Sequence, residues 1–204
     1  MVALAAALGI GYLLGAIPFG VLVARVAGGR DPRTVGSQRT GATNIRRALG
    51  SGWALVVGAL DLAKGLAAAA VGTLIGTAAG LAPEWVAASG CLAAVVGHIR
   101  SVFIGFQGGR GVATAAGGFL VLVPLALVVV IPISGVVLAV TRYVSLASMV
   151  GAAGAPAVVA LLWATDRASV ADIAYAALVG ILIIVAHADN IARLRAGTER
   201  RIGT

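Results

Sequence analysis

The distribution of charged residues constrains the fold of this chain more than any other feature. Arg110 and Arg142 bracket 31 consecutive residues without a charge. Three further uncharged stretches cover residues 1–24, 65–83 and 143–165. A helix needs about 20 apolar residues to cross the roughly 30 Å hydrocarbon core of a bilayer. The chain can therefore cross a membrane several times, and its chemistry must reside in the polar segments between the crossings.

The composition leads to the same class of protein. Of the 204 residues, 60% are hydrophobic and only 11% are charged, whereas a soluble domain carries about a quarter charged residues. We predict an all-α, polytopic membrane protein with residues 1–204 in one domain. Arginines that flank spans account for the net charge of +8, so nucleic acid is not an expected partner. Attraction for anionic lipid or a phosphorylated substrate is a second source of that charge.

Apolar segments predict where the spans lie. The first runs from about Leu4 to Val26, with a kink at Pro18 because proline disfavours a continuous helix. A basic segment, residues 28–52, follows it, and a tight turn at Pro83-Glu84 separates the next two spans. The later single spans are expected at residues 53–81, 85–99, 144–164 and 173–186.

Counting Lys and Arg near span ends predicts the orientation. The segment 28–52 and the tail from His187 onward are basic, which places both in the cytoplasm and the N-terminus outside. The block 111–141 must then leave the cytoplasm and return. One helix of this length would be about 45 Å long, and two full spans need roughly 40 residues. We predict two shortened helices broken near Pro124 to Pro132, for seven transmembrane segments in all. One long tilted span is the alternative.

In this topology four polar clusters share the cytoplasmic face. The first covers residues 36–47, where small residues and glycines allow tight turns with exposed amides. Ser37, Thr43 and Asn44 supply hydroxyl and amide groups, and Arg47 supplies a planar fork suited to phosphate. An ordinary solvated basic loop is the alternative.

The second cluster, residues 107–114, immediately precedes an apolar helix. A helix N-terminus presents unpaired amides, and glycines let the backbone close around an anion. The spacing is not that of a Walker motif. A flexible turn is the alternative to an anion site. The candidate phosphate-binding residues are Gly108, Gly109, Arg110, Gly111 and Thr114.

The third and fourth clusters lie at the start and the end of later spans. Ser145 begins a span, where it can donate to a ligand or bond back to its own helix. His187 and Asn190 are three residues apart and share a face on a helix. A histidine at a membrane edge can exchange a proton near neutral pH, although it can equally be structural.

Three more polar residues interrupt apolar sequence. Asp61 and Lys64 lie at i and i+3, where they can neutralise each other inside a span; a functional and a structural pair are both open. His98 ends the third span as a donor near the site or as a membrane-edge residue. Two histidines and scattered carboxylates do not predict a metal site.

Taken together, the clusters closely resemble one family. The pattern GSxxxGATNxxR is met by residues 36–47, GHxxxxFxxFxGGxGVAT by 97–114, and HxxNxxRLxxGTE by 187–199. These are the motifs of the bacterial acyl-phosphate:glycerol-3-phosphate acyltransferases, the PlsY family. The resemblance covers essentially the whole chain, in order and in spacing.

The resemblance implies a seven-helix enzyme of the bacterial inner membrane with its site at the cytoplasmic face. It would transfer a fatty acyl group from acyl phosphate to the sn-1 hydroxyl of glycerol 3-phosphate, without a cofactor, giving lysophosphatidic acid and phosphate. An enzyme that forms acyl phosphate would be its functional partner. The resemblance implies catalytic or phosphate-orienting roles for Ser37, Arg47, Ser145, His187 and Asn190, and phosphate binding by the Gly-rich motif. We expect structural roles near the site for Glu199 and His98.

The chain departs from the family pattern at a few positions. Arg110 replaces the usual lysine, Gln38-Arg39 stand where Gly-Asn is common, Ser101 replaces a proline, and Ala188 replaces a basic residue. The competing class is a small anion or lipid transporter, which also uses broken helices with amides directed at an anion. An inverted repeat is missing from the sequence, and the polar clusters gather at one face, which favours the enzyme.

Overall fold

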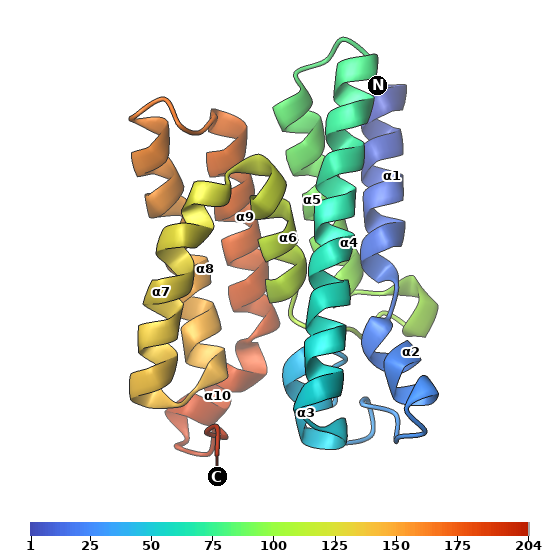
Figure 1. The fold of residues 1–204 in the computed structure, drawn as a ribbon, viewed down its shortest axis with the longest axis vertical. Coiled ribbons are helices and arrows are strands. Elements are labelled where there is room, and N and C mark those ends of the chain that lie inside the picture. Colours follow the sequence, from blue (N-terminus) through green and yellow to red (C-terminus); the bar gives the residue numbers. More distant parts are fainter. Residues whose placement is uncertain (204) are drawn as a thin grey trace. The chain divides into compact units, whose positions relative to one another are not determined.

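The computed structural model describes residues 1–203 (Figure 1). This part of the chain is all-helical, without strands, and divides into two compact units, Met1–Val121 and Leu122–Thr204. Five helical stretches are long and apolar enough to cross a membrane, and two of them, Val2–Val26 and Pro83–Ile104, each join two consecutive helices. The number is six if one bent helix pair counts as a single span. The chain is therefore a multi-pass integral membrane protein, as predicted. The count of seven spans and the orientation stay predictions.

Three long helices, α1, α4 and α5, form the body of the first unit, and the other helices of the unit are shorter. Helix α1 packs against α4 and α5, and α4 packs against α5. The elements are α1 (Val2–Ala16), α2 (Phe19–Val26), α3 (Ala42–Leu49), α4 (Ser51–Ala78), α5 (Pro83–Ile99), the 3-10 helix η1 (Val102–Ile104) and α6 (Val112–Leu122).

Glycines let the helices of the first unit approach closely, as is common in membrane bundles. A Cβ on Gly11 of α1 would overlap the backbone of Gly90 of α5, so these two helices touch at their glycines. Helices α4 and α6 meet in the same way. There, a Cβ on Gly65 would overlap the carbonyl oxygen of Thr114. Small residues thus replace the large interlocking side chains of a soluble core.

The predicted kink at Pro18 is a complete break between α1 and α2. Proline has no amide hydrogen, so the preceding turn loses a hydrogen bond. At the break, the carbonyl of Ala16 accepts from the hydroxyl of Ser101, and that of Ile17 accepts from the N–H of Phe19 at 3.1 Å and from Lys64 Nζ at 3.0 Å. Side chains from two other segments therefore help to satisfy the backbone carbonyls at the break.

The described part of the second unit contains four helices. Helix α8 packs against α7 and α9, and α9 bends by 57° into α10. A capping box between Ser169 and Asp172 starts α9, since each residue satisfies a backbone amide of the other. The elements are α7 (Pro124–Thr141), α8 (Val144–Trp163), α9 (Val170–Ala186) and α10 (Ala188–Arg195).

Several predicted boundaries differ from the structure. The break in the block 111–141 lies at Val123, beside Pro124 and so near its predicted place, but α7 continues through Pro132. Only α6 is short; α7, with 18 residues, is long enough to cross a membrane. Pro83 does not form the turn after α4 but begins α5, because proline fits the first helical position. The basic segment 28–52 is not all loop, since it contains α3.

Candidate active site

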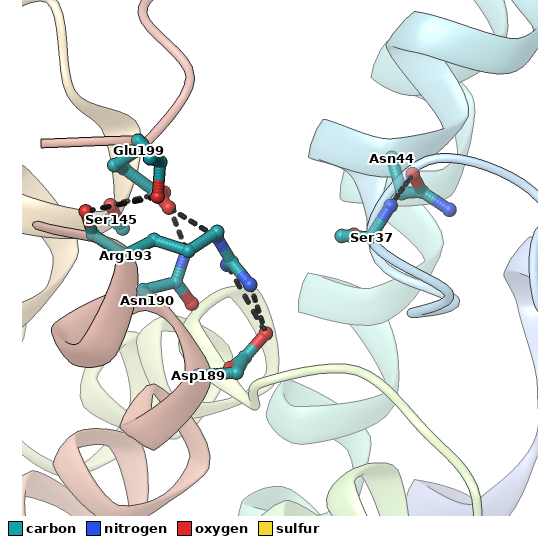
Figure 2. A network of polar contacts seen from close by, with 8 residues as sticks. Ser37, Asn44, Ser145, Asp189, Asn190, Arg193 and Glu199 are labelled. Carbon is teal, nitrogen blue, oxygen red and sulfur yellow. Dashed lines mark hydrogen bonds and ion pairs between the residues drawn. The ribbon is translucent and has the colours of Figure 1, made fainter. Parts of the chain in front are cut away.

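Asn44 organises the basic loop of the first unit. This side chain is 2% exposed, and its amide nitrogen donates to the carbonyls of Pro32 at 2.8 Å and Arg39 at 2.9 Å. Its Oδ1 accepts from the backbone N–H of Ser37 at 2.9 Å (Figure 2). A third, longer contact reaches the carbonyl of Val35 at 3.2 Å. Both ends of the amide are therefore engaged by the loop.

The other candidates of the first cluster lie on this loop and on α3. Ser37 is half-buried on it, and Thr43 is half-buried in the first turn of α3. Arg47 is exposed in the last turn of the same helix. The ion pair between Asp31 and Arg33, at 2.6 Å, braces the start of the loop. The Arg33 guanidinium lowers the pKa of the Asp31 carboxyl. The structure thus brings Ser37 and Asn44 into direct contact.

The Gly-rich segment packs directly on the end of α5. A Cβ on Gly108 would overlap the carbonyl oxygens of His98 and Ile99, and a Cβ on Gly109 would overlap the imidazole of His98. The N–H of Gly109 donates to the carbonyl of His98 at 3.1 Å. Gly111 has a φ of +83°, which few other residues adopt. Gly108 therefore allows two backbones to approach closely, and Gly109 leaves room for the His98 ring. The sequence pattern did not reveal these reasons for glycine.

The same segment leads into α6 through polar residues. Arg110 is half-buried. Thr114 is fully buried in the first turn of the helix, and its Oγ1 makes no hydrogen bond to residues 1–203. A buried hydroxyl of this kind is costly unless a partner satisfies it. Its position fits the predicted anion site at the start of α6.

Glu199 gathers three side chains of the second unit (Figure 2). Its Oε1 accepts from Ser145 Oγ at 2.8 Å and from Asn190 Nδ2 at 2.6 Å, and its Oε2 accepts from Arg193 Nε at 2.7 Å. Burial alone would raise the pKa of Glu199, but the hydrogen bonds from Arg193, Ser145 and Asn190 lower it overall. Arg193 also pairs with Asp189 at 3.2 Å. We call these five residues the Glu199 network.

This network gives Ser145 a partner that neither of the two alternatives for this residue named. Its hydroxyl donates to Glu199 across 54 residues of sequence, so it ties the start of α8 to the tail. The amide oxygen of Asn190 is buried and makes no hydrogen bond within the described part of the chain. Asn190 thus uses its nitrogen for the network and presents an acceptor on its other side.

His187 lies at the bend between α9 and α10 and is 3% exposed. Its Nδ1 lies 2.7 Å from the carbonyl oxygen of Ile183. A carbonyl can only accept, so Nδ1 carries the hydrogen in the neutral ring. The basic nitrogen of neutral His187 is therefore Nε2, and the bend fixes the ring that presents it.

Some polar residues gained a role that sequence reasoning missed. Arg193 and Asp189 complete the Glu199 network, and their i, i+4 spacing on a helix was the available signal.

His98 is buried beside Asp61, and Asp61 and Lys64 form the predicted ion pair, at 2.9 Å. Within residues 1–203, no group of three or more His, Cys, Asp or Glu side chains lies close enough to hold a metal ion.

Comparison with known proteins identifies the family. Residues 5–197 match the sequence profile described as "Glycerol-3-phosphate acyltransferase". The chain belongs to this family. A glycerol-3-phosphate acyltransferase of Synechococcus sp. (strain JA-3-3Ab) is 46% identical over 98% of this chain and 94% of its own length. One from Thermus thermophilus is 45% identical over 94% of this chain and 92% of its own.

Solved structures of the glycerol-3-phosphate acyltransferase family support the same family assignment. The crystal structure of PlsY, an integral membrane glycerol 3-phosphate acyltransferase, in its glycerol 3-phosphate form has a TM-score of 0.85 and 37% identity. The lysophosphatidic acid form of PlsY has a TM-score of 0.83 and 36% identity. Each alignment covers 98% of this chain and 96% of the other. The resemblance stated from the three motifs is confirmed.

Proposed function

We propose that this chain transfers a fatty acyl group from acyl phosphate to the sn-1 hydroxyl of glycerol 3-phosphate. The products are lysophosphatidic acid and inorganic phosphate. The observation that carries this proposal is the family match over residues 5–197, together with 37% identity to a structure of PlsY in its glycerol 3-phosphate form. Because the match includes both compact units, we propose that residues 1–204 act as one acyltransferase domain.

The reaction makes modest demands on the protein. The hydroxyl oxygen attacks the acyl carbonyl carbon, the bond from that carbon to the phosphate oxygen breaks, and the hydroxyl proton leaves with a base. Phosphate is already a good leaving group, so positioning and charge neutralisation are the main contributions. We assign phosphate contacts to Arg47 and to the segment from Gly108 to Thr114, with Arg110 as its charge. We assign Ser37 as the hydroxyl donor of the basic loop and Thr43, in the first turn of α3, as a further phosphate contact.

Two groups remain open as the proton acceptor. One is Nε2 of His187, which is the basic nitrogen because Nδ1 donates to Ile183. The other is an oxygen of a substrate phosphate. We propose direct transfer in either case, without an acyl-enzyme. Trapping a radiolabelled acyl-enzyme after quenching would contradict direct transfer.

The Glu199 network supplies a rigid support in this scheme. Ser145 and Asn190 are both hydrogen-bonded to one carboxylate, which fixes their rotamers. We propose that Asn190 acts on substrate through its buried Oδ1 and that Glu199 has a structural role. Asn44 contributes indirectly, by shaping the loop that bears Ser37.

Location and partners follow from the same proposal. We place the protein in the inner membrane of a bacterium, with seven spans, the N-terminus outside and the polar segments in the cytoplasm. Its apolar helices hold the acyl chain in contact with lipid. The substrates are glycerol 3-phosphate and acyl phosphate, and an enzyme that makes acyl phosphate acts immediately upstream.

One assay tests the function against the transporter alternative. Purified protein is incubated with acyl phosphate and radiolabelled glycerol 3-phosphate, and lysophosphatidic acid and phosphate are measured. We expect both products in equal amounts from the wild-type protein. Uptake of glycerol 3-phosphate into proteoliposomes without any lysophosphatidic acid would favour the transporter and overturn the enzyme.

A further inference from the structure

Three titratable side chains are buried together inside the first unit, in apolar surroundings. Asp61, Lys64 and His98 are each 5% exposed or less. Lys64 Nζ lies 2.9 Å from Asp61 Oδ1, and His98 Nδ1 lies 3.4 Å from the same oxygen. Charged groups within membrane spans are expensive and are retained mainly where they serve a purpose. We call these three residues the buried charge cluster.

Lys64 connects the cluster to the α1–α2 break. Its ammonium donates to the carbonyl of Ile17 at 3.0 Å, and it lies 5.7 Å from the centre of the Phe19 ring. These contacts hold the cation in place, and the cation in turn holds Asp61. The carboxylate therefore has one fixed position from which to hold the next group.

His98 connects the cluster to the Gly-rich segment. Its Nδ1 faces Asp61, while its Nε2 lies where a Cβ on Gly109 would have to sit. The carbonyl of His98 also accepts from the N–H of Gly109. One residue thus touches Gly109 with both its backbone and its ring. Only a ring held in one orientation can serve as a fixed surface for this segment.

We propose that Asp61, Lys64 and His98 form a positioning cluster that sets the backbone of the segment 108–111 for glycerol 3-phosphate. The inference deepens the proposed function and depends on this segment as the glycerol 3-phosphate site. Lys64 fixes Asp61, Asp61 orients the imidazole, and the imidazole supports Gly109. Displacements of about 1 Å in a binding group can cost on the order of 10²-fold in rate. None of the three residues needs to contact a substrate.

The first experiment removes the orientation while leaving the ring. The double variant Asp61→Asn/Lys64→Met removes both charges together, because a single change would leave one buried charge uncompensated. We expect the KM for glycerol 3-phosphate to rise about tenfold, while kcat and the KM for acyl phosphate change less than about twofold. The matched control, Thr73→Val, removes a polar group from the same helix and should change none of the three constants.

The second experiment tests the contact between His98 and Gly109 by a double-mutant cycle. Gly109 has no positive φ, so alanine suits its backbone and only the ring opposes it. His98→Ala and Gly109→Ala should each raise the KM for glycerol 3-phosphate. The double variant should be less impaired than the two effects multiplied, because the new methyl group enters the space that the ring leaves.

A readout independent of activity separates this inference from the proposed function. Hydrogen exchange at the amides of residues 101–114 should become faster in Asp61→Asn/Lys64→Met but not in Thr73→Val. Unchanged exchange and an unchanged KM would overturn the positioning cluster. The positioning cluster would also be overturned if all kinetic constants worsened uniformly and in proportion to a fall in melting temperature. If the wild-type protein forms no lysophosphatidic acid, the proposed function fails, and exchange alone then decides the cluster.

Discussion

The hydroxyl of Ser145 and the amide of Asn190 donate to the same oxygen of Glu199, at 2.8 and 2.6 Å. Two polar residues that the sequence predicts as catalytic are thus held by one carboxylate from the C-terminal tail. Arg193 compensates the negative charge on the other oxygen. The tail is therefore part of the candidate site and not a solvated extension.

Replacing this carboxylate should loosen the second unit. Glu199→Gln keeps the size of the side chain but removes the ionic bond to Arg193. We expect a loss of about 1–3 kcal/mol in stability, typical of breaking charge-assisted hydrogen bonds. The melting temperature in detergent measures it. Glu84→Gln, an exposed carboxylate in the first turn of α5, serves as the control and should change the temperature little.

The same group predicts a pH dependence. The pKa of Glu199 is lowered below its ordinary value of 4.5. Its contribution to stability is therefore fully present above the unfolded pKa and is lost as the pH falls through the folded pKa. The difference in melting temperature between wild type and Glu199→Gln should be largest near pH 7 and should shrink in acid. A constant difference from pH 7 to pH 3 would contradict this assignment.

Asn44→Ala should release the basic loop. The substitution removes the side-chain hydrogen bonds of Asn44 to residues 32–39, so we expect faster limited proteolysis at Arg33 and Arg39. Turnover should fall because Ser37 loses its fixed backbone. Thr34→Ala, on the exposed side of the same loop, is the control. Equal proteolysis of both variants would count against the role of Asn44.

His187→Ala should lower turnover by about 10²-fold or more if Nε2 takes the proton in the transition state. His187→Asn can still donate to the carbonyl of Ile183 and so tests the bend separately from the base. Both variants should be equally slow, with circular dichroism unchanged for His187→Asn. Near-normal turnover in His187→Asn would assign the proton to a substrate phosphate instead.

Gly65→Ala should destabilise the first unit, since its methyl group would overlap the carbonyl of Thr114 across the α4–α6 contact. Overpacking of this kind costs about 1–3 kcal/mol. Gly58→Ala, on the same helix, would meet only the Ala42 methyl group at 3.7 Å. Thermal unfolding in detergent should separate the two variants. Similar melting temperatures would show that α4 and α6 are not packed as described.

The sequence was informative where residue type alone limits the structure. Uncharged stretches identified the long helices, Pro18 located a break, and the three motifs identified the family. The segment 28–52 was harder, because its helix α3 depends on the contacts of Asn44 with a loop that begins a dozen residues earlier. Proline was an ambiguous signal: Pro124 starts a helix, whereas Pro132 lies inside one.

The long-range contacts could not be read from the sequence. Nothing in the spacing showed that Ser145 and Glu199 would meet, or that Gly109 would lie against the ring of His98. These depend on how the helices cross, which is set by small residues that look alike along the chain. The meeting of all four polar clusters on one pair of substrates stays a prediction.

The break at Pro18 has a consequence for how the protein is made. The carbonyl of Ala16 accepts from Ser101, a partner that the ribosome adds dozens of residues later. The carbonyl of Ile17 accepts from the N–H of Phe19 and from Lys64, of which only Lys64 is added much later. A nascent first span would bring unsatisfied backbone into lipid before those partners exist. Its insertion should therefore wait, shielded by water or by the translocation machinery, until the fourth and fifth helices have been synthesised.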